Sequence, residues 1–423
     1  MIGYILSSLF PTRLAEALLL ERVTPMVNSA LVGVAEFRNS HGATVRVFYP
    51  AAAGTSPQGR APVKIFRNGL PFVVEGYTHT FLGLFVAPLV VRVLGWLFAA
   101  WARLHPLAWS ALPRCYHDLP PAAATAPGCD GALPLVVWSH GLTGTGCEHG
   151  LLAVALALRG NVVALVHHSD GSSSLADLRP GSDAVPAARL WYQHPRYSAG
   201  AYDIGMRQRQ AEHRVAEVEE ARAMALALPR LQGLVHSGKV VVGGFSFGAA
   251  TAGLAAATNP SAYVGAVLID GWWHIELKKI GVNQDLPLQV HRAAGTIPVP
   301  ALFIGSEEFQ GYAALNSATL FVQKKFGLGE ESEVGVAAAC GAAKADGTWL
   351  SGGAARGHTA AHVLAGTRHG NFMDAMWWLP RPLLARLGFC GSSPPHATYA
   401  AFVGLVAGFV EARASGHTGR KMD

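Results

Sequence analysis

Residues 239–258 read KVVVGGFSFGAATAGLAAAT, and this stretch decides the fold of the chain. Its first part is an apolar run typical of a buried strand, and its second part is Ala-rich sequence typical of a helix. Between them, Gly244, Ser246 and Gly248 form a G-x-S-x-G pattern. A chain with 48 glycines can contain this pattern by chance, but between a strand and a helix it indicates a nucleophile elbow. Ser246 is therefore the candidate nucleophile, and a structural turn is the alternative.

Apolar runs alternate with helical sequence through most of the chain. The predicted strands are 43–49, 133–139, 161–168, 239–245, 264–270 and 299–305, and the predicted helices are 148–159, 206–229, the segment after Gly248 and 396–414. Continuous apolar runs are typical of strands buried on both faces. Together with the elbow, this alternation predicts an α/β-hydrolase fold, with a mostly parallel central sheet and helices on both faces.

The acid that would hold the catalytic base should end the strand after the elbow. The run VGAVLID ends at Asp270, 24 residues after Ser246 (270 − 246), which is about one helix and one strand. In this fold the chain order is serine, acid, histidine. Asp270 is the leading candidate, and Asp285 is the weaker one because it lies in a polar loop.

The base should follow the acid in the chain. His274 and His291 precede the strand 299–305 and are too early, and His396 is a further, less favoured candidate. His369 lies in AGTRHGNFMDAMWW, where a short loop precedes an aromatic run, so we expect it at the carboxyl edge of the sheet. His358 and His362, in or beside an Ala/Gly-rich segment, are the alternatives.

Two backbone N–H groups should stabilise the oxyanion. One is that of Phe247, directly after the nucleophile and at a helix N-terminus. The other is expected from the glycine-rich loop after strand 133–139, where Gly141 lets the chain turn and Leu142 would donate. The loop contains neither GK[ST] nor G-x-G-x-x-G, so a nucleotide site is not expected.

The composition excludes several classes of protein. Of 423 residues, 51% are apolar and only 14% are charged, which excludes a disordered chain and a coiled coil. The net charge of +6 is mild and no basic run indicates nucleic-acid binding. Five widely spaced cysteines without a CxxC pair predict neither a disulfide scaffold nor a zinc site. We expect no metal and no cofactor.

We predict one hydrolase domain over 28–414. The other predicted segments are an N-terminal part at 1–27 with helical character, an apolar helical insertion at about 72–110, an Ala/Gly-rich insertion at about 333–361 and a flexible tail at 415–423. The first 20 residues lack a basic start and a clear cleavage site, so a secretory signal is not expected.

The stretch 81–104, FLGLFVAPLVVRVLGWLFAAWARL, is long enough to cross a bilayer but carries Pro88 and Arg92 near its middle. Three interpretations stay open: helices packed on the domain, an interfacial helix that contacts a membrane, and a transmembrane span. Trp96, Trp101 and Trp109 would suit a membrane interface.

The motifs SHGLTG, HHSDGSS, GGFSFGAA, LIDGWW and RHGNF resemble those of the platelet-activating factor acetylhydrolases of the plasma and intracellular type II group. The resemblance covers about 28–410. It implies Ser246, Asp270 and His369 as catalytic residues, Leu142 and Phe247 as oxyanion donors, and hydrolysis of a short or oxidised sn-2 acyl group of a phospholipid without calcium or another cofactor. It also implies substrate approach at a lipid surface through an apolar helical patch.

The sequence departs from this family at Phe245, where the family often has histidine, and at the 333–361 insertion. Two other functions stay open: another phospholipase A or carboxylesterase with the same triad, and a catalytically silent, membrane-associated protein of hydrolase fold. We expect a cytoplasmic protein with peripheral membrane association, with an integral anchor as the alternative. The sequence does not indicate the oligomeric state.

Overall fold

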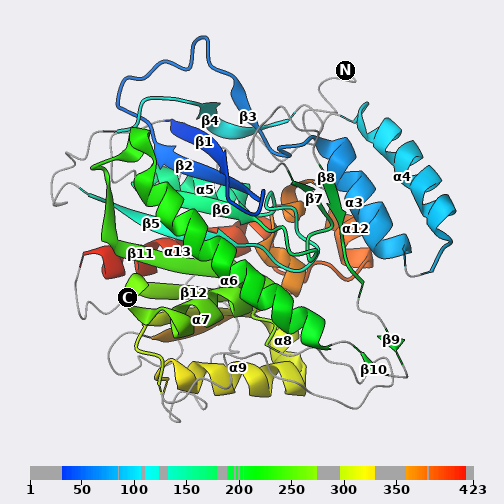
Figure 1. The fold of residues 1–423 in the computed structure, drawn as a ribbon. Coiled ribbons are helices and arrows are strands. Elements are labelled where there is room, and N and C mark those ends of the chain that lie inside the picture. The colour runs from blue at the N-terminus through cyan, green and yellow to red at the C-terminus, as the bar shows by residue number, and fades with distance from the viewer. Residues whose placement is uncertain are drawn as a thin grey trace.

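The computed structural model describes most of the chain, and Figure 1 shows its arrangement. The described residues are 31–83, 85–105, 110–122, 132–178, 188–194, 197–198, 201–202, 204–273, 296–328, 359–378 and 381–415. The predicted segment 1–27, residues 333–358 of the predicted insertion and 416–423 of the predicted tail lie outside them.

A ten-stranded sheet forms the centre of the molecule. Across the sheet the strands are β14 (Ala360–Leu364), β13 (Ala301–Ser306), β12 (Gly265–Ile269), β11 (Val235–Phe245), β5 (Leu133–Ser139), β6 (Val162–His167), β2 (Thr44–Pro50), β1 (Val32–Arg38), β4 (Ala111–His117) and β3 (Pro62–Lys64). From β6 to β14 all neighbours are parallel. β2 is antiparallel to both β6 and β1, β4 is parallel to β1, and β3 is antiparallel to β4. This is the predicted mostly parallel sheet, with a mixed edge.

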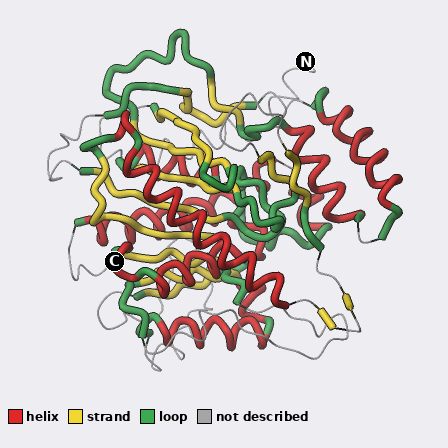
Figure 2. Tube along the Cα trace, in the orientation of Figure 1, coloured by secondary structure: helices red, strands yellow, loops and turns green. Residues whose placement is uncertain are grey.

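Helices cover both faces of the sheet, and further helices lie at its ends. They are α3 (Leu70–Leu82), α4 (Pro88–Ala102), α5 (Gly150–Leu158), α6 (Ile204–Ala227), α7 (Phe247–Thr258), α8 (Glu307–Gly311), α9 (Ala313–Lys325), α11 (Ala375–Trp378), α12 (Arg381–Arg386) and α13 (Pro395–Ala414). Figures 1 and 2 show α6 and α7 on one face and α5 and α13 on the other. The doubly covered sheet is that of an α/β-hydrolase fold, as predicted.

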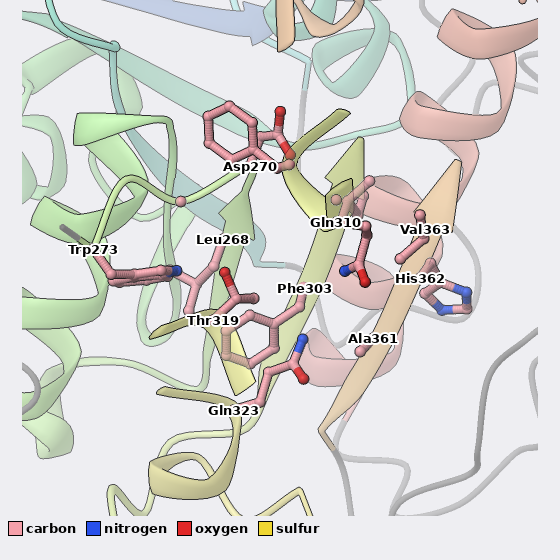
Figure 3. Close-up of a pocket in the computed structure, with 14 residues that line it drawn as sticks. Leu268, Asp270, Trp273, Phe303, Gln310, Thr319, Gln323, Ala361, His362 and Val363 are labelled. Atoms are coloured by element: carbon pink, nitrogen blue, oxygen red, sulfur yellow. The ribbon is translucent and has the colours of Figure 1, made fainter. Parts of the chain in front are cut away.

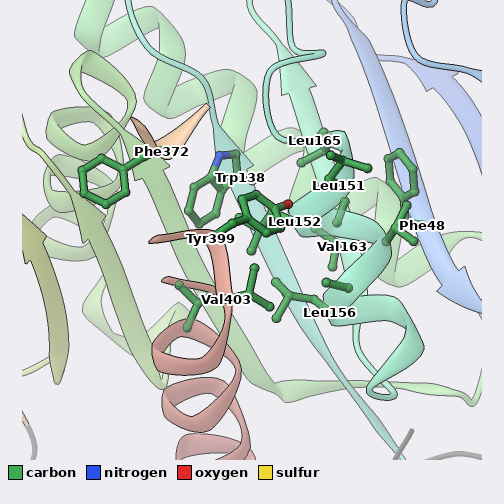
Figure 4. Close-up of a cluster of buried hydrophobic side chains, with 14 of the residues drawn as sticks. Phe48, Trp138, Leu151, Leu152, Leu156, Val163, Leu165, Phe372, Tyr399 and Val403 are labelled. Carbon is green, nitrogen blue, oxygen red and sulfur yellow. The ribbon is translucent and has the colours of Figure 1, made fainter. Parts of the chain in front are cut away.

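The continuous apolar strands fill two cores. In β5, Val136 and Trp138 belong to the core under α5 and α13, while Leu135 and Val137 belong to the core under α6 and α7. Side chains alternate between the faces of a strand, so both sets must be apolar when both faces are covered. Figure 4 shows Trp138 among side chains of α5 and α13 in the first core.

The predicted central strands and helices agree with the structure to within about four residues at their ends. Four strands of the sheet were not predicted from the sequence, namely β1, β3, β4 and β14. β14 begins at Ala360, at the end of the insertion expected at about 333–361, and it pairs with β13. Two small hairpins also occur, β7 (Leu175–Leu178) with β8 (Ala188–Trp191), and β9 (Tyr197–Ser198) with β10 (Ala201–Tyr202).

The apolar stretch 81–104 is divided between two helices. α3 ends at Leu82 and α4 begins at Pro88, where the proline ring suits the first turn of a new helix. α4 has 15 residues, about 22 Å at 1.5 Å per residue, which is shorter than the hydrocarbon core of a bilayer at about 30 Å. The two helices form a pair at one end of the molecule (Figure 1).

Within the part of the chain that is described, α13 is the helix long and apolar enough to cross a membrane. However, 44% of its apolar window is buried inside the molecule. Phe402, Val406 and Val410 belong to the core on the sheet, so packing accounts for much of the apolar character of α13.

Candidate active site

Ser246 lies at the sharp turn between β11 and α7. Its φ of 57° and ψ of −120° are a strained conformation for a residue with a side chain. Its N–H donates to Ile269 O at 2.8 Å, which ties the turn to β12. A Cβ at Gly244 would overlap the carbonyl of Gly248, and a Cβ at Gly248 would overlap that of Ser139. The close approach of these backbones explains why the pattern needs glycine at both positions.

Asp270 directly follows β12, at the same edge of the sheet as Ser246. Its carboxylate is buried, and its φ of 45° is positive. Oδ1 accepts the Ser306 N–H at 2.7 Å, and Oδ2 accepts the Ser306 hydroxyl, also at 2.7 Å. Two donors from β13 thus fix the carboxylate and leave Oδ2 directed toward one more partner.

That partner is His369, the first residue of a short 3-10 helix, η6 (His369–Phe372). Its Nδ1 lies 2.8 Å from Asp270 Oδ2, and its Nε2 lies 3.0 Å from Ser246 Oγ. The carboxylate can only accept, so Nδ1 carries a hydrogen and a neutral ring keeps Nε2 free to accept the serine proton. The structure therefore brings the three predicted residues into one hydrogen-bonded chain.

Two phenyl rings enclose the imidazole of His369. Phe309 from α8 stacks on it at 4.3 Å between ring centroids, and Phe245 lies at 4.5 Å. In addition, Glu308 accepts the backbone N–H of His369 at 2.9 Å. Phe245, where the sequence departs from the family that it resembles, thus helps to fix the orientation of the ring.

The predicted oxyanion donors lie on the two backbone segments that meet at Ser246. Phe247 is the first residue of α7, so its N–H has no acceptor within the helix. Leu142 follows Gly141, where an added Cβ would approach the Ser246 Cβ to 3.2 Å. Among the described residues, no hydrogen bond uses the N–H of Leu142 or of Phe247. Both donors are available to a ligand.

The alternative base His362 is not part of this chain of hydrogen bonds. It lies on β14 and lines a cavity of about 20 Å³ beside Asp270, together with Trp273, Gln310 and Gln323 (Figure 3). Burial lowers the pKa of His362, and its Nε2 has no partner in the described part of the chain. His396 is exposed on α13. The remaining alternatives, Asp285, His274, His291 and His358, lie outside the described residues.

A buried polar network behind the oxyanion loop was not identified from the sequence. Arg214 and Glu217 of α6 are fully buried, and they contact Asp170 and His168 respectively. Burial would raise the pKa of Glu217, but the hydrogen bonds from His168 and His213 outweigh this effect and hold the pKa below its usual range. The sequence carries only a partial signal: four polar residues recur at helical spacing on one face, at 207, 210, 214 and 217, but this spacing does not show that the face lies inward.

Ser306 and Phe309 could not be predicted from the sequence, because their contacts with Asp270 and His369 join segments that are distant in the chain. No group of three or more metal-ligating side chains occurs among the described residues. The described cysteines, Cys115, Cys147 and Cys390, are buried free thiols.

Comparison with protein families matches residues 118–415 to "Platelet-activating factor acetylhydrolase, isoform II". The chain belongs to this family. The match includes all five proposed site residues, from Leu142 to His369, and the helix α6 beneath them. The resemblance inferred from the motifs is confirmed, and the family description names a hydrolase.

Curated relatives carry the same family name at low identity. Platelet-activating factor acetylhydrolase of Canis lupus familiaris is 27% identical over 194 residues, which cover 42% of this chain and 40% of the relative. The protein of Gallus gallus is 25% identical over 201 residues, covering 42% and 44% respectively. That of Bos taurus is 23% identical over 239 residues, covering 52% and 47%. The chain thus matches less than half the length of these relatives.

Among solved structures, a ferulic acid esterase from Streptomyces cinnamoneus superposes with a TM-score of 0.51 at 16% identity, covering 93% of this chain and 92% of that one. At this identity the likeness concerns the fold, and it supports the α/β-hydrolase assignment.

Proposed function

We propose that the protein is a serine esterase that hydrolyses the short or oxidised sn-2 acyl ester of phospholipids such as platelet-activating factor. The observation that carries the proposal is the hydrogen-bonded chain from Ser246 through His369 to Asp270, next to two unpaired backbone N–H groups. Membership of the acetylhydrolase family supports the substrate class.

In the proposed mechanism, Ser246 Oγ attacks the ester carbonyl carbon while His369 Nε2 accepts its proton. Asp270 orients His369 and stabilises the imidazolium. The N–H groups of Leu142 and Phe247 hold the oxyanion, and each such donor contributes about 10²- to 10³-fold to kcat in related sites. His369 then protonates the departing lysophospholipid oxygen. Finally, it activates water, which releases the acid from Ser246.

An acyl-length series tests the substrate class. Wild-type enzyme would be assayed on phosphatidylcholines that carry acetyl, butanoyl, oxidised dicarboxylic or palmitoyl groups at sn-2, and on p-nitrophenyl esters, with and without a calcium chelator. We expect acetyl and oxidised chains to react at least about tenfold faster than palmitoyl, unaffected by chelation. Equal rates for palmitoyl would favour the phospholipase A or carboxylesterase alternative.

The nucleophile is tested with Ser246→Ala, and Ser237→Ala on an exposed part of β11 is the matched control. Ser246→Ala should lose at least about 10⁴-fold in kcat, because loss of a triad serine removes the covalent route. A fluorophosphonate probe should label wild type and Ser237→Ala only. Wild-type rates in Ser246→Ala would refute the mechanism, and absence of labelling in wild type would favour the silent-protein alternative.

We further propose that α4 contacts the lipid surface from which substrate is taken. Val91, Gly95 and Ala99 recur every four residues and are buried, so this narrow stripe of α4 faces the domain. Apart from Arg92, the exposed side chains of α4 are apolar. The large exposed apolar side chains of the α3–α4 region are Phe81, Phe85, Leu89, Val90, Val93, Trp96, Leu97, Phe98, Trp101 and Leu104. An apolar patch of this kind is typical of an interaction with another protein or a membrane.

Lipid binding would be measured by co-sedimentation with phosphatidylcholine vesicles. Trp96→Ser/Trp101→Ser should bind at least about tenfold more weakly, whereas Phe321→Ser, an exposed aromatic on α9, should bind as wild type. Hydrolysis of soluble p-nitrophenyl acetate by the same preparations would show that the active site is intact. Release from membranes by carbonate would support peripheral association, and retention would favour the integral alternative.

A further inference from the structure

Arg214 of α6 lies entirely inside the protein, directly behind the loop that carries Leu142. Its Nη1 donates to His140 O at 2.6 Å, and its Nη2 reaches Gly141 O at 3.5 Å. Since the side chain has no exposed surface, it cannot contact a substrate. Its hydrogen bonds are directed at the backbone of the oxyanion loop.

Gly141 O is held by three donors. Besides Arg214, His140 Nδ1 donates to it at 2.7 Å and the Gly144 N–H donates to it at 3.2 Å. This carbonyl and the Leu142 N–H belong to the same peptide unit, which is planar and trans. Fixing the carbonyl on the buried side therefore fixes the N–H on the opposite side, and donors on the oxygen polarise the N–H as well.

The same guanidinium also contacts the residue of the second oxyanion donor. It lies 4.7 Å from the centroid of the Phe247 ring, in the geometry of a cation–π interaction. One buried cation thus joins the loop after β5 to the first residue of α7.

Other buried groups hold the guanidinium in place. Asp170 Oδ2 pairs with Arg214 Nε at 3.0 Å, and the Ser172 hydroxyl accepts from Arg214 Nε at 2.9 Å. Ser172 O in turn accepts the Thr143 N–H at 2.7 Å, so the HHSDGSS segment binds both the arginine and the loop. Together these contacts form a rigid frame on the buried side of the oxyanion loop.

One helical turn further along α6, Glu217 holds the end of β5. Glu217 Oε2 lies 2.6 Å from His168 Nδ1, and His168 Nε2 lies 2.7 Å from Ser139 Oγ. This chain has the connectivity of a catalytic triad, but all three residues are fully buried. Its place at the last residue of β5 assigns it to support of the loop, not to a second reaction.

We propose that Arg214 is a positioning residue of the esterase, which orients the Leu142 N–H through the Gly141 carbonyl and couples it to Phe247. The inference rests on the proposed function, because it assumes that these two N–H groups bind the oxyanion. It predicts that changes at Arg214 lower kcat while leaving ground-state binding largely intact, since the oxyanion exists only after attack.

Two variants test the proposal. Arg214→Met/Asp170→Asn removes the buried pair together and avoids an unpaired charge, and Arg214→Lys keeps the charge but loses the planar fork that contacts several acceptors at once. Arg222→Met is the matched control, because Arg222 lies on the same helix and pairs with Glu219 instead. Active sites would be titrated with a fluorophosphonate so that kcat refers to competent enzyme.

We expect kcat per titrated site to fall by about 10- to 100-fold in both Arg214 variants, toward the loss seen when one oxyanion donor is removed, with KM within about threefold. Affinity for a trifluoromethyl ketone, which forms an oxyanion on the serine, should fall by the same factor. A residue that only stabilises the fold would lower the titrated fraction and leave both quantities unchanged. Arg222→Met should match wild type.

An unchanged kcat and ketone affinity in folded Arg214→Lys and Arg214→Met/Asp170→Asn would overturn the proposal. Failure of both variants to fold would assign Arg214 to stability and overturn it as well. Ser246→Ala separates this inference from the proposed function. If Ser246→Ala is inactive while the Arg214 variants keep wild-type kcat, only the positioning role fails, whereas an active Ser246→Ala refutes the esterase mechanism itself.

Discussion

Replacing Asp270 by asparagine would exchange a carboxylate oxygen for an NH₂ group and change the tautomer of His369. The shape of the active site would stay the same. In the wild type, Asp270 Oδ2 accepts from His369 Nδ1 at 2.8 Å and from the Ser306 hydroxyl at 2.7 Å. Oδ1 accepts from the Ser306 N–H at 2.7 Å, so an asparagine would keep its oxygen there and direct its NH₂ group toward His369. Two donors cannot face each other, so His369 would adopt the tautomer with the hydrogen on Nε2.

That tautomer directs a hydrogen at Ser246 Oγ and cannot accept the serine proton. The ring would also lose the carboxylate that stabilises its cationic form during attack. In serine hydrolases the equivalent change lowers kcat by about 10⁴-fold, which corresponds to about 5 kcal/mol of transition-state stabilisation. We expect Asp270→Asn to show a loss of this size with KM within about threefold, because the asparagine fills the same space.

The measurement is steady-state hydrolysis of p-nitrophenyl acetate from pH 6 to 10, with circular dichroism to show that the variant is folded. Asp118→Asn is the control, since Asp118 pairs with Arg230 on the surface and should leave kcat unchanged. Activity of folded Asp270→Asn within about tenfold of wild type would show that Asp270 does not set the tautomer of His369. The acid would then have to be sought elsewhere in the chain.

Three further changes probe the surroundings of the site. Gly248→Ala should prevent accumulation of folded protein, measured as soluble yield, because its Cβ would overlap the Ser139 carbonyl; normal yield would contradict this. Ser306→Ala should lower kcat by about tenfold, because Asp270 loses one hydrogen bond worth about 1–2 kcal/mol; an unchanged kcat would contradict it. Burial lowers the pKa of His149 from 6.5 to about 3, so folding favours the neutral ring and the free energy of unfolding should fall as pH drops below 6.5. His149→Phe removes this group, so the free energy of unfolding should depend less on pH, by about 1.4 kcal/mol per pH unit between pH 4 and 6. Urea titrations of both proteins measure this. Parallel pH curves for wild type and His149→Phe would show that His149 is not the source of the dependence.

The three central residues of the site could be predicted because each is tied to a local pattern. Ser246 lies in the elbow, Asp270 ends an apolar run, and His369 opens a loop before an aromatic segment. In a parallel sheet the carboxyl ends of neighbouring strands meet at one edge, so these three local signals are enough to place the residues together.

The groups that support the triad could not be predicted in the same way. Ser306 bonds to Asp270 across 36 positions of the chain, and Phe309 stacks on a histidine 60 positions later (369 − 309). Neither residue type is unusual for its position on a strand end or a short helix. The contacts depend on the register of β12, β13 and η6, which is a property of the folded sheet.

For α6 the sequence predicted a helix over 206–229, in which Glu and Arg recur at helical spacings. The structure buries Arg214 and Glu217 on the same face as Ala211 and Val218. The apolar stripe is interrupted by charges, so periodicity alone could not show that the charges face inward. Their partners lie in the loops after β5 and β6, and only the packing of α6 against those loops satisfies them.

This inward placement changes the meaning of the low charge content. Charged residues make up 14% of the chain, and several of them are wholly or largely buried. These are Arg46, Glu148, Asp170, Arg207, Arg214, Glu217 and Asp374. The surface is therefore less charged than the composition indicates, and the apolar residues of α4 add to this deficit. Of the buried charges, Arg214 and Glu217 lie behind the oxyanion loop. The apolar surface exposed at α4 suits the lipid contact proposed above. Loss of vesicle binding in Trp96→Ser/Trp101→Ser, with the soluble-ester rate retained, would assign the exposed apolar surface of α4 to the lipid contact.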